Sequence, residues 1–135
     1  MSKLGIYVNR QTLSSSEQLT AVVKCRDAAE SMGHTVEFIF PVDMMKIPKL
    51  DALFIRANTD PMNTTYVAAR MAQMYGIPVI DDPGSIQICA DKINMYMHLM
   101  KKDVSMPRTE FLTDSKNSAS ALPSTPGVGM TTPTL

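Results

Sequence analysis

The sequence predicts an α/β fold, a three-layer domain with a mostly parallel sheet of about five strands and helices on both of its faces. Three observations predict it. Short apolar runs rich in β-branched residues alternate with longer segments of helical periodicity. Glycine, proline and capping residues separate these segments. The chain has 135 residues, of which 44% are hydrophobic, enough for the core of one ordinary domain.

The expected strands are short and continuous, as buried parallel strands are. They cover residues 3–9, 34–40, 51–56, 77–80 and 108–113. The intervening stretches at residues 10–13 and 42–50 lack a clear period and are expected to be loops.

A first helix is expected from Ser14, which forms a capping box with Glu17, to Met32, where Gly33 stops it. Its apolar side chains recur at helical spacing, which predicts that this face packs on the sheet. The face comprises Leu19, Val22, Cys25, Ala29 and Met32.

A second helix is expected to begin with Asp60 as N-cap and Pro61 at the first helical position, and to end before Gly76. Its predicted buried face comprises Val67, Met71 and Met74.

Two shorter helices follow the fourth strand. Asp82 and Pro83 repeat the cap-and-proline pattern and open the first of them, and Asp91 caps the second. The second is expected to turn its apolar residues inward, namely Ile93, Tyr96, Met97 and Met100.

Composition bounds the function classes. Lys plus Arg and Asp plus Glu both number 13, so no net field attracts nucleic acid or an anionic membrane, and neither is an expected partner. No apolar stretch approaches the roughly 18 residues of a membrane span, and no secretory leader pattern is evident, so a cytoplasmic location is expected. Cys25 and Cys89 form no CxxC pair and are expected to be buried, reduced thiols, with no metal site.

Residues 114–135 differ from the rest. They are rich in serine, threonine and proline and lack periodicity, which is typical of a linker or disordered tail. The predicted organisation is therefore a domain at residues 1–113 followed by this tail.

Several familiar nucleotide-binding and catalytic motifs are not found in the sequence. The segment after Gly5 has no GxGxxG pattern, and no glycine is followed by the GK[ST] of a phosphate-binding loop. Ser85, His98 and Asp81 contain the residue types of a hydrolase triad, but no GxSxG elbow supports one. A receiver-like domain would need acidic residues after the first strand, where Asn9 and Arg10 stand instead.

Arg56 is a stronger candidate for a functional residue than any of these motifs. It directly follows an apolar strand, so it is expected at the edge of the sheet where parallel α/β folds bind ligands. Its guanidinium suits bidentate recognition of a carboxylate or phosphate. The alternative is an ordinary ion pair with nearby Asp60.

Lys92 stands in the first turn of a predicted helix, against the preference set by the helix dipole, which suggests a functional role. The alternative is a solvated lysine. Asp81 and Asp82 could be paired carboxylates for metal or acid–base chemistry. The simpler interpretation gives Asp82 a capping role and Asp81 a place in the turn.

Three segments together resemble the N-terminal region of RimK-type and glutathione-synthetase-like ATP-grasp ligases. They are residues 51–63 (DALFIRANTDPMN), 76–99 (GIPVIDDPGSIQICADKINMYMHL) and 106–113 (MPRTEFLT). In that family an arginine ends a strand, a DDP-S-I or NNP-S-I turn follows later, and an (N/D)K helix precedes a P-x-T strand. Order and spacing agree over residues 3–113.

The resemblance implies a pre-ATP-grasp, Rossmann-like fold and an enzyme that phosphorylates a carboxylate with ATP and Mg²⁺ before an amine attacks the acylphosphate. It implies that Lys92 contacts the nucleotide phosphates and that Arg56 grips an amino-acid or peptide carboxylate. It further implies that Asp82, Pro83 and Ser85 shape the turn. Homodimers are common in the family.

Beyond Thr113 the family continues through a second lysine, a glycine-rich phosphate loop and acidic and asparagine ligands for Mg²⁺. This sequence has the Ser/Thr/Pro-rich segment there, so these residues alone are expected to be inactive, with neither ATP nor Mg²⁺ bound. The alternative is a stand-alone, non-catalytic module for binding a small ligand or for assembly.

Overall fold

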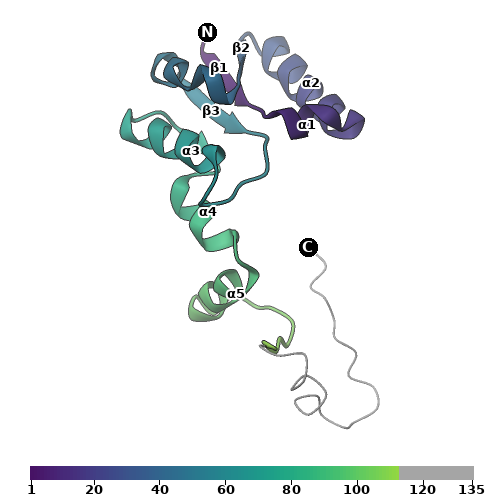
Figure 1. Ribbon diagram of the computed structural model, residues 1–135, viewed down its shortest axis with the longest axis vertical. Helices are drawn as coiled ribbons and strands as arrows, with labels where there is room; N and C mark the ends of the chain where they lie inside the picture. The colour runs from purple at the N-terminus through teal and green to yellow at the C-terminus, as the bar shows by residue number, and fades with distance from the viewer. Residues whose placement is uncertain (113–135) are drawn as a thin grey trace. The chain divides into compact units, whose positions relative to one another are not determined.

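The computed structural model describes residues 1–112 and shows an α/β fold (Figure 1). One sheet of four strands has the order β2-β1-β3-β4, and every pair in it is parallel. The predicted fold class is confirmed. The strands are β1 (Lys3–Tyr7), β2 (Thr35–Ile39), β3 (Ala52–Ile55) and β4 (Val79–Ile80).

The central strand β1 fixes the register of the sheet. Tyr7 is paired with Ile39 of β2 and with Ile55 of β3, so the three strands end level with one another. Phe54 of β3 is paired with Ile80 of β4. All four carboxyl ends therefore lie along one edge of the sheet.

The helices alternate with the strands as predicted, but two expected loops are helical. The helical elements are α1 (Arg10–Ser14), α2 (Ser16–Ser31), η1 (Pro41–Lys49), α3 (Thr64–Met74), α4 (Pro83–Cys89) and α5 (Lys92–Lys101). The loop expected at residues 10–13 is the short helix α1, and that expected at residues 42–50 is the 3₁₀ helix η1. Asn9 caps α1, because its side chain accepts a hydrogen bond from the Thr12 backbone N–H at 2.8 Å.

The N-cap predicted for the first long helix is wrong by one residue. The side chain of Ser15, rather than that of Ser14, accepts from the Gln18 N–H and caps α2. Ser14 closes α1 instead, where its hydroxyl donates to the Gln11 carbonyl at 2.7 Å. Adjacent serines cap equally well, so the position of α1 decides between them.

The start predicted for α3 is also wrong. The carboxylate of Asp60 accepts from the Met62 N–H at 2.7 Å, which makes a local turn. Asn63 is the N-cap, and its side-chain oxygen accepts from the N–H groups of Thr65 and Tyr66. Proline tolerates both a turn and a helix start, so it did not fix the boundary.

The predicted helix stops are confirmed. Gly33 and Gly76 follow the caps of α2 and α3 with φ of +86° and +69°, the left-handed region that a side chain rarely adopts.

Helix α2 covers one face of the sheet (Figure 1), where Val22 packs against Ile6 and Val8. The predicted buried stripe of α2 is narrower than expected. Val22 is buried and Cys25 half-buried, whereas Leu19 and Met32 are exposed. Only the middle of α2 packs on the sheet, so the side chains near its two ends stay exposed.

The opposite face carries the larger core, which α3 and η1 cover. Its sheet residues include Tyr7 and Leu53, and η1 contributes Ile47. The buried face predicted for α3 is wrong for Val67 and Met74, which are exposed, whereas Met71 is half-buried and packs against this core. The inward residues are small and follow helical spacing, namely Thr65, Ala68, Ala69 and Ala72. Small side chains let the helix approach the sheet closely, which outweighs the greater apolar area of methionine.

The expected fifth strand does not form over residues 108–112, and Thr113 lies outside the described residues, as does the predicted tail at 114–135. The chain divides into two compact units, Met1–Ala90 and Asp91–Leu135. In the second unit Tyr96 stacks on Phe111, with ring centroids 6.4 Å apart. The predicted inward face of α5 is largely exposed, at Ile93, Met97 and Met100.

Cys25 and Cys89 are free thiols, and the expectation of burial is wrong for Cys89, which is exposed. Among residues 1–112 no helix is long and apolar enough to cross a bilayer.

Replacing Ala69 by leucine tests the face assigned to α3. Ala69 is fully buried, so Ala69→Leu is expected to lower the free energy of unfolding by about 1–3 kcal/mol through overpacking. Val67→Leu on the exposed side of the same helix should change it by less than about 0.5 kcal/mol. Urea denaturation of the purified variants measures both, and equal effects would contradict the assignment.

Candidate functional site

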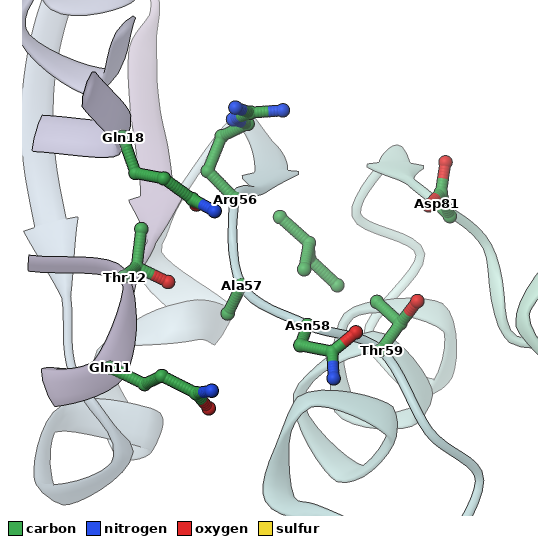
Figure 2. Close-up of a pocket in the computed structure, with 9 residues that line it drawn as sticks. Gln11, Thr12, Gln18, Arg56, Ala57, Asn58, Thr59 and Asp81 are labelled. Carbon is green, nitrogen blue, oxygen red and sulfur yellow. The ribbon is translucent and has the colours of Figure 1, made fainter. Parts of the chain in front are cut away.

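A pocket of about 380 Å³ opens at the carboxyl edge of the sheet, where α/β folds bind their ligands (Figure 2). Its walls come from α1, the start of α2, the loop after β3 and the residue after β4. The neutral polar lining residues are Gln11, Thr12, Gln18, Asn58 and Thr59. Two ionisable residues complete the polar lining, Arg56 and Asp81.

The backbone of Arg56 is fixed by the sheet. Its N–H donates to the Tyr7 carbonyl at 2.9 Å, so the hydrogen-bonded ladder between β1 and β3 extends one residue past the end of β3. The side chain therefore starts from a rigid position at the rim of the pocket. Figure 2 shows it beside Gln18 and across from Asp81.

The guanidinium of Arg56 has no hydrogen-bond or ion-pair partner in the part of the chain that the structure describes. Its Nε is buried and forms no hydrogen bond, and within residues 1–112 no carboxylate forms an ion pair with this side chain. The expected alternative, an ion pair with Asp60, is not formed, because Asp60 is engaged in its own turn. A buried donor without a partner is uncommon and needs an explanation.

The loop that carries Asn58 and Thr59 is tied down at its far end. The side-chain amide of Asn63 donates to the Asn58 carbonyl at 3.0 Å while its oxygen caps α3. Asn63 thus couples the loop to the helix, and the pocket wall on this side follows α3.

Asp81 and Asp82 have different environments although they are neighbours. Asp82 is the N-cap of α4: one oxygen accepts from the backbone of Gly84 and Ser85 at 2.9 and 3.1 Å, and the other accepts from the Ser85 hydroxyl at 2.6 Å. The hydrogen bond from the Ser85 hydroxyl, followed by those from the backbone, holds the pKa of Asp82 below its ordinary value. Pro83, the first helical residue, is buried, so these three residues build the turn.

Asp81 lines the pocket, is exposed, and forms no hydrogen bond or ion pair with any residue in the described part of the chain. Asp82 is occupied as a helix cap, so only Asp81 of the hypothesised carboxylate pair is available for acid–base or metal chemistry. Among residues 1–112 no three histidine, cysteine or acidic side chains are arranged to hold a metal ion.

Lys92 is the first residue of α5, in the unit Asp91–Leu135, and its side chain is exposed. Asp91 caps this helix by accepting from the Asn94 N–H at 2.8 Å. Because the carboxylate of Asp91 already occupies the helix terminus, a phosphate there would be bound by the ammonium of Lys92 rather than by the helix itself.

A second hollow of about 230 Å³ lies in the unit Met1–Ala90 and is lined by apolar residues that include Ile6, Phe54 and Ile80. It offers no charged or amide side chain to recognise a polar ligand. The Arg56 pocket is therefore the stronger candidate site.

Sequence reasoning identified Arg56 and considered Asp81 only as one of a carboxylate pair, so it did not bring these two together and missed the neutral polar residues of the pocket. Asp81 directly follows β4, Asn58 and Thr59 lie in the loop after β3, and Gln11 and Thr12 lie shortly after β1. The rule that ligands bind beyond the carboxyl ends of parallel strands would have marked these five. Gln18 lies within α2 and not after a strand, so no local sequence pattern identifies it as a pocket residue. Comparison with protein-family models and with curated proteins finds no match to this chain.

Replacing Asp82 by alanine removes the cap of α4 and is expected to lower the free energy of unfolding by about 1 kcal/mol at pH 7. The folded-state pKa of Asp82 is depressed, so its contribution is present above the unfolded pKa and is lost as pH falls through the folded value. The difference between wild type and Asp82→Ala should therefore shrink in strongly acidic buffer, as measured by thermal unfolding.

Asp81→Ala is the matched control for that experiment, because the side chain of Asp81 accepts no hydrogen bond from the described residues. A loss of stability at Asp81 equal to that at Asp82 would contradict the division between the two carboxylates.

Proposed function

We propose that this chain is the substrate-side, N-terminal domain of an ATP-dependent carboxylate–amine ligase, in which Arg56 binds the carboxylate of an amino-acid or peptide substrate. The observation that carries the proposal is that the guanidinium of Arg56, in a pocket at the carboxyl edge of a parallel sheet, has no partner among residues 1–112. The resemblance to RimK-type and glutathione-synthetase-like ligases gives the reaction class.

The physical case for a carboxylate ligand starts from desolvation. A buried N–H that gives up water without gaining a partner costs about 1–3 kcal/mol, which a bound acceptor would recover. A carboxylate can accept two parallel hydrogen bonds from a guanidinium, and the fixed backbone of Arg56 presents the group in a reproducible place.

Lys92 is proposed to contact the nucleotide phosphates, which its exposed position at the start of α5 supports. In the complete enzyme ATP and Mg²⁺ would supply the phosphoryl group that activates the substrate carboxylate. The residues of this chain would bind and orient the substrate.

The cytoplasm is the proposed location, which the two free thiols support because such thiols persist in a reducing compartment. A homodimer is proposed from the resemblance.

A second candidate function is a stand-alone module that binds a small carboxylate without catalysis. One observation favours it: all residues that line the pocket belong to the unit Met1–Ala90, so binding there does not depend on the second unit. The two candidates share the ligand-binding step and differ in whether the bound carboxylate is later activated.

Replacing Arg56 by glutamine is expected to weaken the binding of N-acetylglycine, a simple carboxylate probe, by about ten-fold or more, because a charged bidentate contact is lost. NMR titration of residues 1–135 measures the affinity. The melting temperature should hardly change, since the Arg56 side chain has no partner to lose within the described residues 1–112.

Arg70→Gln is the matched control. Arg70 is exposed on α3, where it bonds only Gln73 among the described residues, and it does not line the pocket. Equal affinity of Arg56→Gln and wild type for the probe would reject the assigned role of Arg56.

Residues 1–135 alone are expected to hydrolyse no ATP and to bind it with a Kd of ~1 mM or weaker, because a single lysine supplies little of the binding energy of a phosphate site. Lys92→Ala should weaken that binding further, whereas Lys101→Ala at the other end of α5 should not. ATP turnover by the purified chain that Lys92→Ala abolishes would contradict a role limited to the substrate side.

A further inference from the structure

We infer that the Arg56 pocket takes a zwitterion, a small molecule with both a carboxylate and an ammonium group, and that Asp81 is the residue that binds the ammonium. This inference rests on the proposed function in one respect, that Arg56 takes the carboxylate. It adds a specificity-determining residue and narrows the substrate class.

The sheet register brings the two charges to the same hollow. Phe54 and Ile80 are paired, so Arg56 stands two residues, and Asp81 one residue, beyond paired positions of β3 and β4. Neighbouring strands are about 4.8 Å apart. Figure 2 shows Arg56 and Asp81 on opposite sides of the pocket.

The side chains of Arg56 and Asp81 do not form an ion pair with each other. No ion pair joins Arg56 to Asp81, and Asp81 has no other partner among residues 1–112, unlike Asp82, which is occupied as a helix cap. Each group is thus available to a ligand that reaches between them.

The charge balance of the pocket selects among ligands. Arg56 and Asp81 are the two ionisable residues in the lining, so their formal charges sum to zero. A dicarboxylate or a phosphate would satisfy Arg56 but would be repelled by Asp81. A ligand with one charge of each sign satisfies both residues, and the repulsion between like charges weakens the binding of ligands that carry only negative charge.

The remaining lining suits the uncharged parts of such a ligand. The side-chain amides of Gln11 and Asn58 can each donate and accept hydrogen bonds. The volume of about 380 Å³ lies within the range of small-molecule sites, about 300–1,000 Å³.

Three probes of similar size test the inference by NMR titration of residues 1–135: glycine, N-acetylglycine, which keeps only the carboxylate charge, and glycinamide, which keeps only the ammonium. Glycine is expected to bind about five-fold more tightly than N-acetylglycine, the effect of one partly exposed charge pair. Glycinamide should bind the most weakly, since it cannot use Arg56.

Asp81→Asn should abolish the advantage of glycine by weakening its binding, and it should not weaken the binding of N-acetylglycine, because it removes a negative charge from the pocket of an anionic probe. The matched control Asp27→Asn removes an exposed carboxylate on α2, outside the pocket lining, and should preserve the advantage.

The outcomes separate this inference from the proposed function. If N-acetylglycine binds through Arg56 but Asp81→Asn leaves glycine binding unchanged, the role of Asp81 is rejected and that of Arg56 survives. If no carboxylate binds, both are rejected. Tighter binding of inorganic phosphate than of glycine would identify a simple anion site and overturn the zwitterion.

Discussion

Parallel pairing of the central strand β1 with its two neighbours is the constraint on which the rest of the structure depends. Because Tyr7 is level with Ile39 and Ile55, the chain leaves the sheet at the same edge each time, and polar residues placed after different strands converge there. The pairing also fixes the Arg56 backbone through its bond to Tyr7. The fold therefore holds the backbone at the site and leaves the guanidinium available for a ligand.

Adjacent carboxylates after β4 show how one local sequence separates architecture from recognition. Asp82 accepts three hydrogen bonds within α4, which favour its ionised form and fix the turn. Asp81 receives none from the described residues and faces the pocket. Its availability depends on the cap beside it, because without Asp82 the strand-to-helix turn that presents Asp81 would be less well defined. The same logic holds at Asn63, which caps α3 and also holds the loop of Asn58.

Helix α3 shows where pattern alone fails. Two apolar stripes recur at helical spacing along it, one with Val67 and Met74 and one with Ala68, Ala69 and Ala72. Hydrophobicity favours the first stripe, but the sheet buries the second, since alanine leaves room for close packing against Tyr7 and Leu53. Gly5 acts similarly within β1, where a Cβ would collide with the side chain of Leu50 and would also meet side-chain atoms of Leu53 and Ile39 at 3.1 and 3.2 Å. Gly5, which does not begin a GxGxxG nucleotide-binding motif, is therefore required by close packing within the sheet.

By itself the sequence determined the class of fold, the four strands, the glycine stops and the placement of Arg56 at a strand end, because these depend on short-range patterns of side chains and backbone preference. Only the tertiary structure decided the strand order, the buried face of α3 and the residues that line the pocket with Arg56. Gln11 and Gln18 reach the pocket with Arg56 although about 40 residues separate them in the chain. No local pattern encodes which strands become neighbours, since that outcome follows from packing the whole sheet between its helices. The lack of a partner for Arg56 among residues 1–112 is likewise a property of three-dimensional packing, because Asp60 is held in its own turn and does not pair with the guanidinium.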